Sequence, residues 1–150
     1  MVDRARVDQL LVLLARYVTI LRDLATTSAD EFQGDPRSYG SGERFLQLAI
    51  ETTLNMGHHV IAARGLGQPG TYAEVFTLLG KAGVLDAAFA AGLESMAWMR
   101  NRLVHAYEDV DPTRVHDLLR TRLGDFDRFA LEVTSYLDRI DATGDSEPAP

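Results

Sequence analysis

The sequence contains no cysteine. This absence excludes disulfide scaffolds, cysteine-ligated zinc or iron–sulfur sites and cysteine nucleophiles. Long hydrophobic runs are absent as well, because the longest nearly apolar stretch, Val84 to Leu93, is too short to span a bilayer and is interrupted by Asp86. The first six residues carry charges where a signal peptide would be apolar. We therefore expect a cytoplasmic protein without a membrane partner.

Basic residues are in the minority. The chain has 15 Lys and Arg against 22 Asp and Glu, which gives a formal net charge of −7. General nucleic-acid coat proteins are usually basic, so any RNA contact must come from a local site. A length of 150 residues fits one domain that buries its core without a metal or disulfide. We expect a single domain over residues 1–141 and a disordered acidic, proline-containing tail over 142–150.

Hydrophobic residues recur at steps of three and four along nearly the whole chain, which is typical of amphipathic helices. Ser28 with Glu31, and Asp35 before Pro36, mark a break after the first helix, and the glycine-rich segment 65–70 marks a loop. We predict helices over about 7–24, 42–63, 86–108 and 111–140, with a short one after Thr71. The fold class is therefore an all-α bundle of four main helices plus a short helix.

The helix predicted over 86–108 carries an unusual set of polar residues. Arg100 falls on its apolar stripe, where a buried charge costs several kcal/mol unless it is paired. Asn101 and His105 are one turn apart and share a face, and Tyr107 lies two turns from Arg100. Arg100 and His105 are offset by about 140° around the helix, so one straight helix does not point both at one atom. Taken singly, these residues read as an ion-paired arginine, a hydrogen-bonded histidine and a core tyrosine.

Together these residues resemble a known family. The segment Arg-Asn-Arg-Leu-Val-His-Ala-Tyr, with Arg100-x4-His105-x-Tyr107, looks like the motif of the HEPN superfamily, and in particular of HepT-like toxins. Residues 43–51 resemble the second helix of that family, and Val110-Asp111-Pro112 resembles its entry into the last helix. The resemblance implies a helical HEPN-like homodimer with an active cleft at the dimer interface and a metal-independent endoribonuclease activity that needs no cofactor.

The same resemblance implies a type VII-like toxin–antitoxin pair. The partner is a minimal nucleotidyltransferase antitoxin that transfers AMP to the tyrosine of the motif, here Tyr107. Metal-independent cleavage of an RNA substrate uses the 2′-hydroxyl as nucleophile, so a base and an acid are needed. Histidine suits either role near neutral pH, which assigns His105. Arg100 would bind the scissile phosphate, Asn101 would orient His105 or the phosphate, and a second His105 from the other copy would take the opposite proton role.

Two other functions stay open. The first is a non-catalytic helical subunit, or a substrate-recognition partner, of a minimal nucleotidyltransferase, which the net charge of −7 favours. The second is a metal-binding bundle with Glu51, His58 and His59, although adjacent histidines point about 100° apart and no Glu-x-x-His pair is present.

Other polar residues of the last helix have structural interpretations. We expect His116 to be a partly exposed structural residue. The basic residues Arg114, Arg120, Arg122 and Arg128 alternate with aspartates, which favours a solvated, ion-paired face over an RNA track.

Overall fold

The computed structural model describes residues 1–105 and 110–144, and within these ranges it contains eight helices and no strand. The expected all-α bundle is confirmed. The helices are α1 (Arg4–Ala25), α2 (Ala29–Gly34), α3 (Pro36–Arg64), α4 (Tyr72–Lys81), α5 (Ala87–Gly92), α6 (Glu94–His105), α7 (Pro112–Thr121) and α8 (Gly124–Thr143).

Local sequence explains where most helices begin. Side chains of Asp3, Ser28, Asp35, Thr71 and Asp111 each accept a hydrogen bond from a backbone N–H in the first turn of the helix that follows. Such caps satisfy donors that the helix itself leaves unpaired. Gly65 ends α3 with φ 63°, a left-handed conformation that glycine adopts without steric cost.

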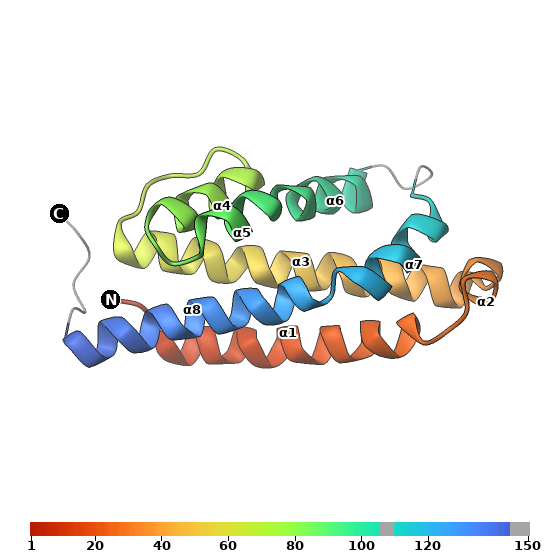
Figure 1. Cartoon of the computed structure of the whole chain (residues 1–150), viewed down its shortest axis with the longest axis horizontal. Coiled ribbons are helices and arrows are strands. Elements are labelled where there is room, and N and C mark those ends of the chain that lie inside the picture. The colour runs from red at the N-terminus through yellow and green to blue at the C-terminus, as the bar shows by residue number, and fades with distance from the viewer. Residues whose placement is uncertain (106–109, 145–150) are drawn as a thin grey trace.

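The long central helix α3 organises the bundle. It packs against α1 on one side and against α4 and α6 on the other, while α2 and α7 contact its N-terminal part. Figure 1 shows α4, α5 and α6 as a layer along one side of α3, with α1 and α8 along the other. Along the chain, α3 and α6 run in opposite directions, so the end of α6 points toward the beginning of α3 (Figure 1).

One hydrophobic cluster joins all these layers. The apolar face predicted for the first helix is buried at five positions, Val7, Leu10, Leu14, Val18 and Leu21. Close packing between α3 and α4 requires Gly57, because a Cβ there would lie 2.6 Å from Val75 Cγ1. Phe76 of α4 meets Phe129 of α8 edge to face, with ring centroids 6.2 Å apart.

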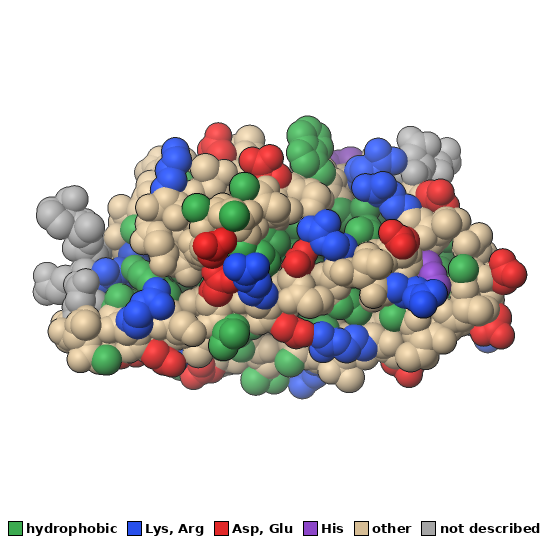
Figure 2. Space-filling view, in the orientation of Figure 1, with side chains coloured by type: hydrophobic (Ala, Val, Ile, Leu, Met, Phe, Trp, Pro, Cys, Tyr) green, Lys and Arg blue, Asp and Glu red, His purple; other side chains and the backbone are tan. Residues whose placement is uncertain are grey.

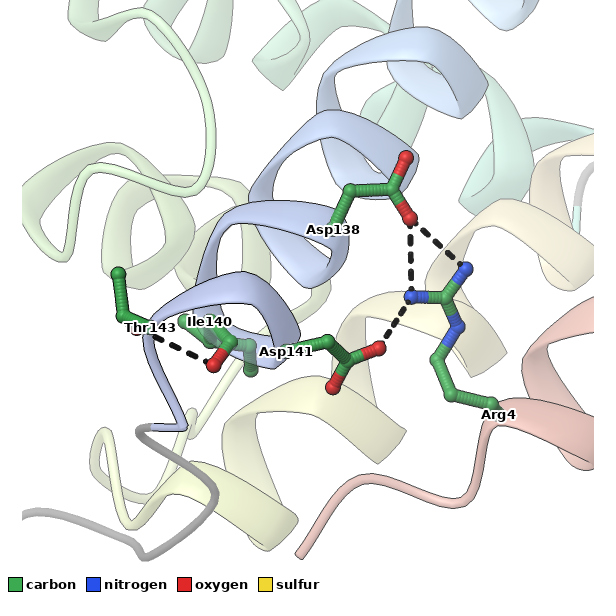
Figure 3. A network of polar contacts seen from close by, with 5 residues as sticks. All are labelled: Arg4, Asp138, Ile140, Asp141 and Thr143. Atoms are coloured by element: carbon green, nitrogen blue, oxygen red, sulfur yellow. Dashed lines mark hydrogen bonds and ion pairs between the residues drawn. The ribbon is translucent and has the colours of Figure 1, made fainter.

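Polar contacts connect the ends of the first and last helices. Arg4 donates to Asp138 at 3.1 Å and to Asp141 at 2.9 Å, and Thr143 donates to the carbonyl of Ile140 at 3.2 Å (Figure 3). The ion pairs are largely exposed, so each contributes only about 0–1 kcal/mol. These ion pairs align α1 with α8 but contribute little to the free energy of unfolding.

The structure interrupts two helices that the pattern predicts as continuous. The expected helix over 86–108 is α5 and α6, with a tight turn at Leu93, and its predicted end lies outside the described residues. The expected last helix is α7 and α8, separated at Arg122 and Leu123. The six-residue α2 fills the predicted break, α3 begins six residues earlier than expected, and α8 continues to Thr143.

His116 is more buried than we expected. Its side chain is 4% exposed, its Nε2 lies 2.7 Å from the carbonyl oxygen of Thr27, and its ring packs 5.1 Å from that of Phe32. The prediction of a structural role fits these contacts, but the prediction of partial exposure is wrong, because α2 and the turn before it cover this side of α7.

Candidate functional site

Arg100 is held between two neighbouring helices. Its Nε lies 3.4 Å from Oε1 of Glu51 on α3, and its guanidinium carbon lies 4.5 Å from the ring centroid of Tyr72 on α4. The side chain is only 16% exposed. A cation over an aromatic face gains about 0.5–2 kcal/mol, and the carboxylate adds a counter-charge. The partner that the sequence requires for a cation on this stripe is therefore Glu51, with Tyr72 as its platform.

The contact between Arg100 and Glu51 is an ion pair without a hydrogen bond. Arg100 Nε is buried and has no hydrogen-bond partner among the described residues. Glu51 Oε1 instead accepts a hydrogen bond from Gln47 Nε2 at 3.2 Å, one turn earlier on α3. Gln47 thus fixes the carboxylate, and the carboxylate positions the arginine.

Arg100 lines a groove between α3, α4 and α6. We call this the Arg100 groove, and its walls are Glu51, Leu54, Asn55, His58, Tyr72 and Arg100. A neighbouring depression, the Asn101 hollow, is lined by His58, Pro69, Gly70, Thr71, Tyr72 and Asn101. His58 and Tyr72 belong to both. Consecutive residues of α6 therefore face two adjoining depressions with a shared wall.

His105 lies apart from these depressions. It is the last residue of α6, it is exposed, and it lines neither the Arg100 groove nor the Asn101 hollow. This placement agrees with the 140° offset expected between Arg100 and His105 on one helix. Tyr107 lies outside the described residues. Of the four predicted site residues, the structure brings Arg100 and Asn101 to adjoining depressions and points His105 to solvent.

The residues considered for a metal site do not converge. Glu51 is paired with Arg100, His58 lines the Arg100 groove, and His59 accepts a hydrogen bond from the backbone N–H of Asp3 at 3.2 Å. The adjacent residues His58 and His59 of α3 therefore lie in different surroundings. Within residues 1–105 and 110–144, no three histidine, cysteine or acidic side chains are placed to share one metal ion.

Figure 2 shows acidic and basic side chains interspersed on the visible face. Arg122 pairs with Asp125 at 2.8 Å and Arg128 with Glu132 at 2.6 Å, as expected for a salt-bridged face.

Burial raises the pKa of Glu43 on α3 above its usual value. In the part of the chain that the structure describes, no helix is both long and apolar enough to cross a membrane.

Comparison with known proteins identifies the family. The model of the family "Ribonuclease HepT-like" matches residues 14–133, a span that contains Arg100, Asn101, His105 and Tyr107. The chain therefore belongs to the ribonuclease HepT-like family, which confirms the family resemblance expected from the sequence.

Individual relatives are similar over most of their length. A tRNA nuclease HepT of Aphanizomenon flos-aquae is 27% identical over 139 residues, which cover 93% of this chain and 95% of the relative. An mRNA nuclease HepT of Shewanella oneidensis is 26% identical over 104 residues, covering 61% of this chain and 78% of the relative. A solved structure of the tri-AMPylated Shewanella oneidensis HEPN toxin in complex with MNT antitoxin has the same fold, with a TM-score of 0.79, 21% identity, and coverage of 86% of this chain and 96% of that one.

Proposed function

We propose that this protein is a metal-independent endoribonuclease toxin that cleaves RNA with Arg100 and His105. The observation that carries the proposal is the mounting of Arg100, a nearly buried cation held in a groove by Tyr72 and Glu51. An arginine fixed in this way loses little conformational freedom when it binds an anion, and its planar fork matches phosphate oxygens. Membership of the ribonuclease HepT-like family supports the same activity.

His105 supplies the proton chemistry of the proposal. The 2′-hydroxyl of the RNA attacks the adjacent phosphorus, His105 accepts the hydroxyl proton, and the 5′-oxygen leaves after it gains a proton. Arg100 stabilises the charge that grows on the phosphate oxygens. Asn101, half-buried and one turn before His105, orients the phosphate or the imidazole. These residue roles rest on the geometry of α6 and on the family motif.

A second copy completes the cleft. Arg100 lines a groove against α3 and α4, whereas His105 is exposed at the end of α6 and points elsewhere. One chain therefore does not aim both side chains at one phosphate. A homodimer with two-fold symmetry resolves this, because Arg100 and His105 of both copies then face a shared cleft, where the second histidine protonates the leaving oxygen. Size measurement in solution tests this directly, with a dimer expected.

Cleavage assays test the assignment. In EDTA, RNA should be cut by the wild type, and the rate should fall about 10²–10⁴-fold in His105→Ala and about 10²–10³-fold in Arg100→Ala. Arg120→Ala is the matched control, because it removes an equal charge from an exposed position on α7 and should cleave normally. Full activity of His105→Ala would contradict the catalytic assignment. RNA binding without cleavage would instead favour the non-catalytic binding subunit.

The proposed partner is a minimal nucleotidyltransferase antitoxin that adds AMP to Tyr107. The tri-AMPylated relative in complex with MNT antitoxin supports this, and Tyr107 stands two residues after His105 in the sequence. Each added phosphodiester brings a negative charge that competes with RNA for Arg100. Mass spectrometry after co-expression should find AMP on Tyr107 and none in Tyr107→Phe. Modification confined to other residues would refute the role of Tyr107.

A further inference from the structure

Trp98 is the only tryptophan of the chain, and its side chain is 67% exposed on α6. The other exposed large hydrophobic side chains among the described residues lie outside α6, at Met1, Val12 and Leu131. In Figure 2, hydrophobic atoms protrude at the upper edge of the molecule over α6, with histidine and basic side chains beside them. The helix that carries the proposed site therefore presents one isolated aromatic surface to solvent.

Trp98 shares a face of α6 with residues of the proposed site. Asn101, Arg102 and His105 follow it by three, four and seven residues, so all four lie within about 100° around the helix. His105 is two turns away, roughly 10 Å along the axis. Arg102 and His105 are exposed and Asn101 is half-buried. A flexible strand whose phosphate lies at His105 can reach the indole with a neighbouring nucleotide.

The residues on this face of α6 are better suited to binding a nucleobase than to binding the surface of another protein. Trp98 is 67% exposed, so of the roughly 250 Å² of a large aromatic side chain it offers at most about 170 Å², whereas a stable protein interface buries about 800 Å² on each partner. The neighbours of Trp98 on the face are Glu94, Asn101, Arg102 and His105, all of them polar. An aromatic plate beside a basic residue and hydrogen-bonding groups is the arrangement by which proteins hold unpaired bases and their phosphates.

We infer that Trp98 stacks on an unpaired base next to the scissile phosphate, so that the substrate class is single-stranded or looped RNA. This inference rests on the proposed ribonuclease function, because it takes the position of the phosphate from Arg100 and His105. Stacking on an aromatic side chain is tolerant of base identity, since every base has a π-face. Trp98 therefore selects unpaired over paired RNA, and contributes little to sequence preference.

A fluorescence titration tests the contact at one residue. Because Trp98 is the only tryptophan, the emission of the inert variant His105→Ala reports on this position alone. A dye-labelled 12-nucleotide single strand should quench that emission along the same curve as its own anisotropy rises. The same strand in a duplex should bind more weakly and quench less.

Kinetic measurements with the active enzyme distinguish stacking of a base on Trp98 from a general hydrophobic contact. Trp98→Ala and Trp98→Leu should raise KM about 5- to 150-fold with kcat within threefold, while Trp98→Phe should stay within about threefold of the wild type. Leu131→Ala, which removes an equally exposed hydrophobic side chain on α8, should leave both constants unchanged.

Four results would overturn the inference. RNA that binds by anisotropy without changing the emission, or Trp98→Leu that cleaves like the wild type, shows that no base stacks on the indole, and the ribonuclease function then stands alone. An emission shift that depends on protein concentration without RNA shows that a second copy covers Trp98. If the wild type neither cleaves nor binds RNA, the proposed ribonuclease function and the stacking both fail.

Discussion

Replacing Glu51 with glutamine should destabilise the protein through Arg100. Arg100 is only 16% exposed and its Nε lies 3.4 Å from Glu51 Oε1, so the substitution leaves a nearly buried cation without its counter-charge. Glutamine preserves the volume of the side chain, and Gln47 can still donate to its oxygen. The change therefore removes charge while it leaves packing in place.

The size of the effect follows from the distance and the burial. Two unit charges 3.4 Å apart attract by about 1 kcal/mol in water and by about 5 kcal/mol at an effective dielectric constant of 20. Glu51 is 32% exposed, so solvent weakens the pair, and desolvation of both groups offsets part of the attraction. We expect a net coupling of about 1–2 kcal/mol, which corresponds to roughly 2–8 °C in Tm for a domain of this size.

A double-mutant cycle measures this coupling. Urea unfolding followed by far-UV circular dichroism gives the free energy of unfolding for the wild type, Glu51→Gln, Arg100→Met and the double variant. The loss caused by Glu51→Gln should shrink by about 1–2 kcal/mol once Arg100 is methionine, because no charge then remains to be satisfied. Asp141→Asn, which breaks an exposed ion pair with Arg4, is the control and should cost at most about 0.5 kcal/mol. Additive effects within 0.3 kcal/mol would refute the claim that Glu51 positions Arg100.

Urea unfolding of three further variants tests buried contacts elsewhere in the bundle. Gly57→Ala should lower the free energy of unfolding by about 1–2 kcal/mol, since the new Cβ would lie 2.6 Å from Val75 Cγ1; a gain of about 1 kcal/mol from helix propensity alone would contradict this. His116→Ala should lower it by about 2–4 kcal/mol, because it leaves the carbonyl of Thr27 unpaired and opens a cavity, and an unchanged value would refute that role. Burial raises the pKa of Glu43, so its ionisation weakens the folded state as pH rises through that raised pKa; Glu43→Gln should gain stability relative to the wild type from pH 4 to 6, and a constant difference would contradict the shift.

The fold was largely predictable because local signals and periodicity agree. The caps at Ser28, Asp35, Thr71 and Asp111 were visible as sequence patterns, and the structure shows each in use. The interruption at Leu93 was not predictable, because its buried side chain continues the hydrophobic period across the turn.

The predictions of two other helix boundaries were wrong for related reasons. Leu123 keeps the apolar stripe across the gap between α7 and α8, so the pattern reads as one helix. At the start of α3, residues 37–41 are polar or glycine apart from Tyr39 and show no stripe, although Asp35 and Pro36 mark the true beginning. Capping chemistry was the better guide there than hydrophobic period.

The sequence indicated Arg100, Asn101 and His105 as candidate site residues, but it did not indicate their contacts. The need of Arg100 for a partner follows from a charge on an apolar stripe, but the identity of Glu51, 49 positions earlier, depends on how two antiparallel helices are aligned. Tyr72 gave no sequence signal, because an aromatic at the start of a short helix reads as core. The exposure of Trp98 was not predictable from the sequence either, because the exposure of a helical side chain depends on how the helix packs in the fold.

We propose that this chain cuts RNA through the 2′-hydroxyl with Arg100 and His105 of α6. The most direct measurement is the wild-type reaction in EDTA on an RNA oligonucleotide carrying a mapped cut site, beside the same oligonucleotide with a single 2′-deoxy residue at that site. We expect the all-RNA strand to be cut to a 2′,3′-cyclic phosphate and a 5′-hydroxyl, and the deoxy strand to remain intact. Equal cleavage of both strands, or loss of all cleavage in EDTA, would refute this mechanism.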